Sequence, residues 1–346
     1  MKSVFSLLFC AFSAVVSFAQ EAVVGINTAT TQRWQVVSFG NDPLKVRQYT
    51  FANGLTLITS TQQKSPRVYT MVAVRTGSKN DPADHTGLAH YLEHMLFKGT
   101  DKYGSLDWSK EEPLLKQIDQ LYEKYNHSKD PIARKAIYRA IDSVSQLAAK
   151  FSIANEYDKM CQAMGAQGTN AFTSTDETVY INDIPSNMVN KWIALEAERF
   201  RNPILRLFHT ELEAVYEEKN ISMDRVGDKV YEVMMADLFQ KHNYGLQTTI
   251  GTIEHLKNPS LKAIRNYYNT YYVPNNMAII MAGDFNPDEA AKMVAEKFAY
   301  MKKTEVPVYK FEEETGSLLR MFVSPIIFTP FLTTILSTSV NSAFPP

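Results

Sequence analysis

The chain has 346 residues, of which 45% are hydrophobic and 21% are charged, a composition typical of globular proteins. This length is enough for two domains with well-buried cores. The formal net charge of -1 argues against a nucleic-acid partner, because nucleic-acid binders usually carry an excess of basic residues.

The first 19 residues are predicted to form a secretory signal peptide. Lys2 gives a positive start, residues 4–16 are mostly apolar, and Ser17-Phe18-Ala19 supplies a cleavage site with small residues. The mature protein is therefore expected to be periplasmic or extracellular. Cleavage there leaves Cys161 as the one cysteine, which excludes an internal disulfide.

The next part of the chain is rich in residues that favour strands. Two such runs surround Asn53-Gly54 within residues 46–60, which is a strong hairpin signal. A third run covers residues 67–76, and the polar turn at residues 77–82 ends it. The pattern predicts three strands of one sheet.

A helix with two histidines and a glutamate is predicted directly after this turn. Asp84 or Thr86 can cap it, and it runs over about residues 87–97. At about 100° per residue, the histidines of His90-Tyr91-Leu92-Glu93-His94 lie about 40° apart on one helix face, with Glu93 beside them. This spacing predicts part of a zinc site with a candidate base.

Residues from about 105 to 158 are predicted to form an inserted helical hairpin. Apolar residues recur at helical spacing in two long stretches, and residues 126–131 separate them, with Pro131 at a plausible first helical position. We interpret the hairpin as a spacer or packing brace in preference to a functional element.

The remaining elements mix helices and strands without strict alternation. This favours an α+β fold, with a mixed, mostly antiparallel sheet flanked by helices, over a doubly wound sheet. Taken alone, residues 170–174 have the composition of a loop. Strands are expected at residues 178–184 and 277–283, and helices at about residues 187–200, 209–223, 231–239, 259–268 and 288–300.

The regular pattern ends near residue 315, so we predict one domain over residues 40–315. A tail of residues 316–346 follows, without any charged residue from Met321 onward. Pro325 and Pro330 argue against a membrane helix in this tail. Its sequence is typical of the end of an incomplete chain.

A catalytic zinc ion usually has three protein ligands and leaves one position for water, so two histidines are one ligand short. The acidic helix at residues 209–223 offers candidates. Glu211 and Glu218 are seven residues apart and about 20° from eclipsed, whereas Glu217 points about 100° away from Glu218. Spacing alone does not choose between Glu211 and Glu218, and without the upstream motif a solvated helix face is the favoured interpretation. The other histidines, expected to be surface or packing residues, are His85, His127, His209, His242 and His255.

Several motifs together resemble the pitrilysin/insulinase (M16) family of zinc metallopeptidases. The central motif is the inverted His-x-x-Glu-His at residues 90–94. Supporting segments are Thr86-Gly87-Leu88-Ala89, Phe97-Lys98-Gly99-Thr100, Asn170-Ala171-Phe172-Thr173, Tyr272-Val273-Pro274-Asn275-Asn276 and Met281-Ala282-Gly283-Asp284. The resemblance covers about residues 46–314 apart from the hairpin and corresponds to the family's catalytic half.

The resemblance implies a role for each residue of the motif set. His90, His94 and Glu218 would bind one Zn²⁺ per chain, with Glu211 tuning the site from outside the ligand set. Glu93 would be the general base for attack by a metal-activated water on a peptide bond. Asn170 and Ala171 would contact an extended substrate through the edge of a sheet, which favours unfolded peptides or small proteins.

Two functions are compatible with this resemblance. The first is a secreted zinc endopeptidase, supported by the complete set His90, Glu93, His94 and Glu218. The second is a non-catalytic or partner-dependent subunit, because family peptidases enclose the substrate between two related halves and no second half follows residue 314. The hairpin accounts for the long interval between His94 and Glu218, and a surface insertion of this kind costs little.

Overall fold

The computed structural model describes residues 22–25 and 34–314, so the predicted signal peptide and tail lie outside the described residues. Eight strands of the described part form one sheet in the order β1-β2-β3-β4-β8-β5-β7-β6. Only β4 and β8 are parallel neighbours, and the other neighbouring pairs are antiparallel. The strands are β1 (Ala22–Gly25), β2 (Trp34–Phe39), β3 (Val46–Phe51), β4 (Thr56–Thr61), β5 (Arg67–Val74), β6 (Gln167–Thr173), β7 (Thr178–Pro185) and β8 (Met277–Gly283).

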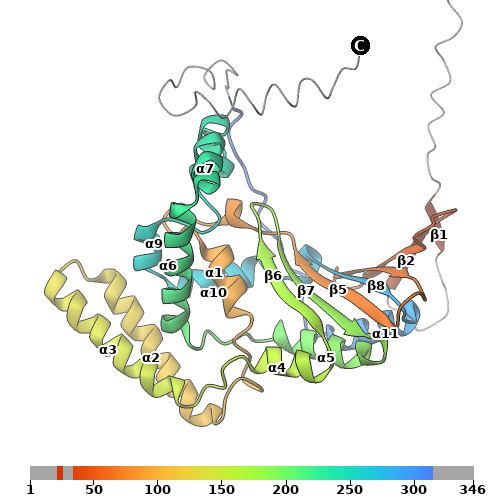
Figure 1. Cartoon of the computed structure of the whole chain (residues 1–346), viewed down its shortest axis with the longest axis horizontal. Coiled ribbons are helices and arrows are strands. Elements are labelled where there is room, and N and C mark those ends of the chain that lie inside the picture. Colours follow the sequence, from red (N-terminus) through yellow and green to blue (C-terminus); the bar gives the residue numbers. More distant parts are fainter. Residues whose placement is uncertain (1–21, 26–33, 315–346) are drawn as a thin grey trace, which may run out of the picture.

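Helices flank this sheet, which confirms the predicted α+β fold (Figure 1). Helix α1 contacts β6 and β7, while α5 packs against β7 and α11, and α11 against β4. The helices are α1 (Leu88–Met95), α2 (Trp108–His127), α3 (Pro131–Ala149), α4 (Glu156–Ala163), α5 (Val189–Arg199), α6 (Phe208–Asp224), α7 (Val226–Leu238), α8 (Asn243–Leu246), α9 (Ile253–Lys257), α10 (Leu261–Tyr271) and α11 (Pro287–Lys297), with short 3₁₀ turns η1 (Ser78–Asn80), η2 (Ser186–Met188) and η3 (Pro274–Asn276).

Alternating side chains place one face of the central strands in the core. In β5 and β8 every second residue is buried, and the register pairs Val72 of β5 with Ile279 of β8, whose other neighbour is Leu57 of β4. A slip of one residue would turn this whole set toward solvent, so burial fixes the register. The sheet is therefore a rigid base for the helices that carry the site.

Helices α2 and α3 pack against each other as a hairpin that extends away from the sheet (Figure 1). Asp107 caps α2 by accepting from Lys110 N, and Asp130 caps α3 by accepting from Ile132 N and Ala133 N. Pro131 occupies the first turn of α3, as expected. The caps, the turn and the apolar stripes of α2 and α3 all favour the same helical hairpin, so signals within this segment are enough to predict it.

Other elements differ from the prediction. Residues 167–173 form the edge strand β6 because they pair with β7; composition alone favours a loop there, whereas the family resemblance implies a sheet edge at Asn170 and Ala171. Strands β1 and β2 precede residue 40 and extend the same sheet, and α4, α8 and α9 also escaped the sequence analysis. In the part of the chain that the structure describes, no helix combines the length and apolar character needed to cross a membrane.

Candidate metal centre

Helix α1 carries the two histidines, and its apolar side chains fix the helix in the core. Leu92 and Met95 are fully buried beneath the sheet and neighbouring helices. His90 and His94, one turn apart, consequently face the opposite helix α6, and their rings meet edge to face with centroids 4.7 Å apart. The predicted placement of both imidazoles on one face is confirmed.

The start of α1 is fixed by Asp81 rather than by the expected Asp84 or Thr86. Gly87 directly precedes the helix in the left-handed conformation (φ 89°). As a glycine it has no side chain that could cap the helix. The Asp81 carboxylate accepts from Gly87 N at 2.7 Å and from Ala89 N at 3.0 Å. Thr86 instead bonds His255, and Asp84 pairs with His85. The capping prediction was wrong because the chain folds back from the preceding turn.

Replacing Asp81 with alanine is expected to destabilise the protein by about 2 kcal/mol or more, since buried backbone N–H groups of α1 lose their acceptor. Burial raises the pKa of Asp81 to about 8, against the backbone hydrogen bonds that lower it. The folded protein therefore holds a proton that the unfolded chain releases near pH 4, and this contribution to stability is lost as pH rises toward 8.

Urea unfolding at pH 5 and pH 8 measures both effects. Asp81→Asn keeps one acceptor oxygen and cannot titrate, so its free energy of unfolding should fall less than that of the wild type over this pH interval. Parallel pH profiles for the two proteins would contradict this account of Asp81.

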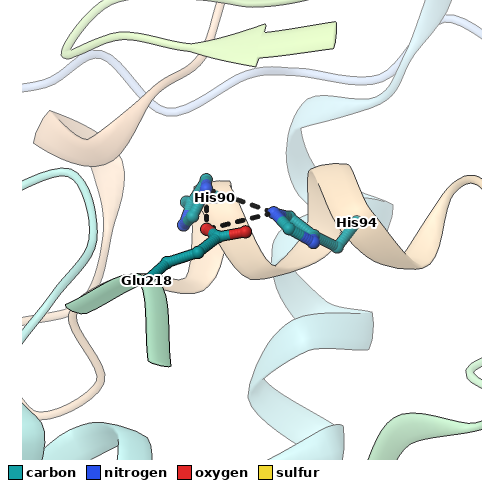
Figure 2. Close-up of side chains that lie close together, drawn as sticks. All are labelled: His90, His94 and Glu218. Atoms are coloured by element: carbon teal, nitrogen blue, oxygen red, sulfur yellow. Dashed lines mark hydrogen bonds and ion pairs between the residues drawn. The ribbon is translucent and has the colours of Figure 1, made fainter. Parts of the chain in front are cut away.

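Helix α6 brings a carboxylate to the two imidazoles (Figure 2). Glu218 Oε2 lies 3.5 Å from His90 Nε2 and 3.7 Å from His94 Nε2, and these two nitrogens are 3.2 Å apart. One ligand atom from each residue lies within 4.8 Å of the others, a grouping found once among the described residues. Glu217 turns aside and accepts from Asn220 on its own helix.

The donor set fits a zinc ion. His94 Nδ1 lies 2.8 Å from Glu211 Oε1, which leaves the Nε2 lone pair of His94 directed toward His90 and Glu218. Burial, with the neighbouring His94, lowers the pKa of His90 to about 4, so His90 is a neutral donor at neutral pH. Two imidazole nitrogens and a carboxylate oxygen that converge in this way match the ligands zinc prefers.

Glu211 lies beside this group of side chains and contacts His94. Its second oxygen is 2.6 Å from Lys98 Nζ, and the Glu211 side chain is only 14% exposed. Burial works against the charged form of Glu211, but His94 and Lys98 outweigh it and lower the pKa of Glu211. Burial likewise opposes the charged imidazole of His94, yet Glu211, Glu218 and Glu93 together raise the pKa of His94. Lys98 was not singled out from the sequence, because this contact depends on how α6 crosses α1.

Glu93 points from α1 toward the edge strand β6. Thr173 of β6 donates its hydroxyl to Glu93 Oε2 at 2.6 Å. Burial raises the pKa of Glu93, although the Thr173 hydrogen bond and the charge of His94 oppose this. A desolvated carboxylate with a raised pKa beside a ligand set has the properties of a proton acceptor.

A cavity of about 450 Å³ joins these groups to strand β6 and helix α6. Ala171 lines it, whereas Asn170 does not. The other lining residues lie outside the motifs and were not predicted from the sequence; they are Ile221, Ser222, Arg225, Thr249 and Ile250. A larger cavity of about 560 Å³ between α2 and α10 contains none of the metal-site residues. The smaller cavity is therefore the candidate substrate cleft.

The five remaining histidines make local contacts away from the site. The Nδ1 atoms of His127 and His255 bond Glu123 O and Thr86, and His85 pairs with Asp84. His209 meets the hydroxyl of Tyr122, and His242 accepts from Tyr244 N. None of them belongs to the metal-ligand grouping of the described residues.

Two histidines and a glutamate on one helix, opposed by a carboxylate on another, are the arrangement of a zinc metallopeptidase centre. The chain belongs to the insulinase peptidase family, M16. The model of "Insulinase (Peptidase family M16)" matches residues 56–112 and 144–251, and that of "Peptidase M16 inactive domain" matches residues 259–325.

Relatives and solved structures agree with this membership. The chain is 26% identical to the probable zinc protease PqqL of Haemophilus influenzae, over 72% of this chain and 22% of that protein. It is 24% identical to the mitochondrial-processing peptidase subunit beta of Dictyostelium discoideum, over 74% of this chain and 44% of that protein. The chain therefore spans less than half the length of these relatives.

The fold is shared with solved structures at lower identity. A protease from Helicobacter pylori superimposes with a TM-score of 0.58 and 23% identity, covering 76% of this chain and 52% of that one. The first half of the periplasmic protease PqqL from Escherichia coli gives a TM-score of 0.57 and 18% identity, covering 77% of this chain and 48% of that one.

Proposed function

We propose that this protein is an exported zinc endopeptidase that hydrolyses peptide bonds in unfolded peptides or small proteins. The convergence of His90, His94 and Glu218 beside the buried Glu93 carries this proposal. Family membership and relatives named as zinc proteases support the peptidase activity and the choice of metal. The predicted signal peptide, with a periplasmic protease among the similar structures, supports export to the periplasm or beyond.

Each residue of the site has its own part in the proposed peptide hydrolysis. His90, His94 and Glu218 would hold one zinc ion, which supplies a Lewis acid that lowers the pKa of water and stabilises negative charge on the peptide oxygen. Glu93 accepts the proton of the attacking water and passes it to the leaving amine. Glu211 keeps His94 in the tautomer with a free Nε2.

Strand β6 supplies a means of holding substrate. It is the last strand in the sheet order, so one side of its backbone lacks a neighbouring strand within the described part of the chain. An extended peptide can add to that edge through main-chain hydrogen bonds, with Asn170 and Ala171 as contacts. Such recognition favours unfolded substrates over particular side chains.

A partner-dependent subunit is the second candidate function. The coverage of its relatives favours it, because the chain matches 22% of one zinc protease and 47% of another, and a first half among the solved structures. In this case a second M16 half, on the same polypeptide or another, would complete the substrate chamber.

Zinc-loaded protein beginning at residue 20 is expected to cleave a quenched, unstructured peptide, and a chelator should stop the reaction because it removes the metal. Chelator-sensitive turnover by the chain alone would support the endopeptidase. Stoichiometric zinc binding without turnover would favour the subunit that needs a second half. Absence of both zinc binding and cleavage would refute the proposed metal site.

A further inference from the structure

The helix that carries Glu211 and Glu218 begins without a cap of its own. Leu207 precedes α6 in the left-handed conformation (φ 54°), and its side chain makes no capping hydrogen bond. This conformation is unfavourable for a residue with a branched side chain and persists only where neighbouring groups impose it. The place of the first turn of α6 must therefore be set by contacts from other elements.

Two sets of contacts hold that first turn. From α1, the Tyr91 hydroxyl donates to Phe208 O at 2.6 Å. From α2, the hydroxyl of the buried Tyr122 lies 2.9 Å from His209 Nδ1, and its ring meets Phe208 edge to face. Tyr138 of α3 packs its ring against His209, with centroids 5.1 Å apart. Part of the support for the first turn of α6 thus comes from the helical hairpin.

The hairpin is itself tied firmly to the body of the protein. At its base, Arg206 bonds both oxygens of the buried Glu111. Along its length, Arg265 of α10 pairs with Asp119, and Asn126 donates to Pro259 O. Because these contacts fix the hairpin to the rest of the protein, the hairpin can hold α6 in one position.

The family model leaves residues 113–143 of this hairpin unmatched, although it matches the chain on both sides. Tyr122 and Tyr138 both lie in the unmatched segment. The support that they give to α6 is thus built from residues added to the part that the family model describes.

We propose that the hairpin α2–α3 is a positioning brace for α6, and that the Tyr122 hydroxyl sets the place at which Glu211 and Glu218 reach His94 and His90. The proposal rests on the proposed zinc site. Glu211 lies two residues after His209, so a displaced first turn shifts Glu211 directly and Glu218 two helical turns farther along. Tyr122 touches neither metal ligand nor substrate and acts only through α6.

Tyr122→Phe tests the proposal because it removes one hydroxyl and keeps the ring. Zinc affinity is expected to fall about threefold to tenfold, toward the lower end of effects from groups outside the ligand set. The visible absorption of the Co²⁺-substituted protein should also change, since it reports ligand geometry. Tyr125→Phe is the matched control, because Tyr125 lies on the same helix and its hydroxyl makes no hydrogen bond to α6 among the described residues. Its ring, which contacts Arg134 and Tyr138, is kept in the variant.

A second variant replaces residues 113–143 with a short flexible linker. Ser105 and Ser152 pair across the base of the hairpin and α2 packs against α3, so a short linker can connect the remaining first turns of α2 to the last turn of α3. This variant should lose more zinc affinity than Tyr122→Phe. If it does not fold, the point variant decides.

The outcomes separate the brace from the metal site itself. Wild-type affinity and an unchanged cobalt spectrum in Tyr122→Phe would overturn the brace and leave the zinc site intact. An equal loss in Tyr125→Phe would also overturn it, because the effect would then be general. If the wild type bound no zinc, the proposed function and the brace would fail together.

Discussion

Replacing Glu93 with glutamine is expected to abolish peptide cleavage while zinc stays bound. Glutamine has the same shape and can still accept the Thr173 hydroxyl, but it cannot take a proton from water. General-base catalysis typically contributes a factor of about 10² to 10⁴, so the cleavage rate should fall by a factor of at least about 10². The measurement is cleavage of a quenched peptide, with the second half added if the wild type requires one, together with zinc content.

A control separates the base from its surroundings. Thr173→Val removes the hydrogen bond to Glu93 but keeps the carboxylate, so the loss of rate should be smaller, about tenfold. Unchanged cleavage by Glu93→Gln would exclude Glu93 as the base. Loss of zinc from Glu93→Gln would instead mean that Glu93 contributes to holding the metal.

The sequence predicted correctly those elements that depend on interactions within a single segment of the chain. The hairpin around Asn53-Gly54 and the helices α2 and α3 follow from turn residues, caps and apolar spacing that lie within each segment. The two histidines of α1 share a face for the same reason, because a spacing of four is fixed by helix geometry. These features need no knowledge of distant contacts.

Features that depend on distant contacts were not predicted, or were predicted wrongly. Strand β6 has Gly168 and Asn170, which disfavour strands, so local signals did not predict it and only the family resemblance indicated a sheet edge there; it is extended because it pairs with β7. The cap of α1 comes from Asp81 across a turn, and Lys98, which follows the end of α1, reaches Glu211 on α6. Pairing, burial and helix crossing decide these contacts, and a single sequence does not encode them in a readable pattern.

The two glutamates of α6 illustrate the same limit. Their spacing of seven places both on one face, and helical rise separates them by about 10 Å along the axis. Geometry from sequence could not decide which one faces the imidazole Nε2 atoms, and only the family resemblance favoured Glu218. In the structure Glu211 lies at His94 Nδ1, whereas Glu218 lies near both Nε2 atoms.

Glu218→Gln is expected to weaken zinc binding by more than about 100-fold, because a neutral amide replaces a carboxylate ligand. Glu211→Gln should cost less, about 10-fold to 100-fold, since His94 keeps an acceptor at Nδ1 and loses only the charge beside it. Competition with a coloured chelator measures both dissociation constants at one pH.

Glu217→Gln is the matched control, because Glu217 is on the same helix and, within the described part of the chain, its side chain bonds Asn220 and none of the metal-site residues. Its zinc affinity should equal that of the wild type. A larger loss in Glu211→Gln than in Glu218→Gln would exchange the two assignments. The pair Lys98–Glu211 is 2.6 Å apart and largely buried, so removing the Glu211 charge leaves an unpaired ammonium beside His94. Such an ammonium would repel the metal, so Lys98→Met combined with Glu211→Gln should recover part of the affinity lost in Glu211→Gln alone, whereas it should recover none of the loss in Glu218→Gln.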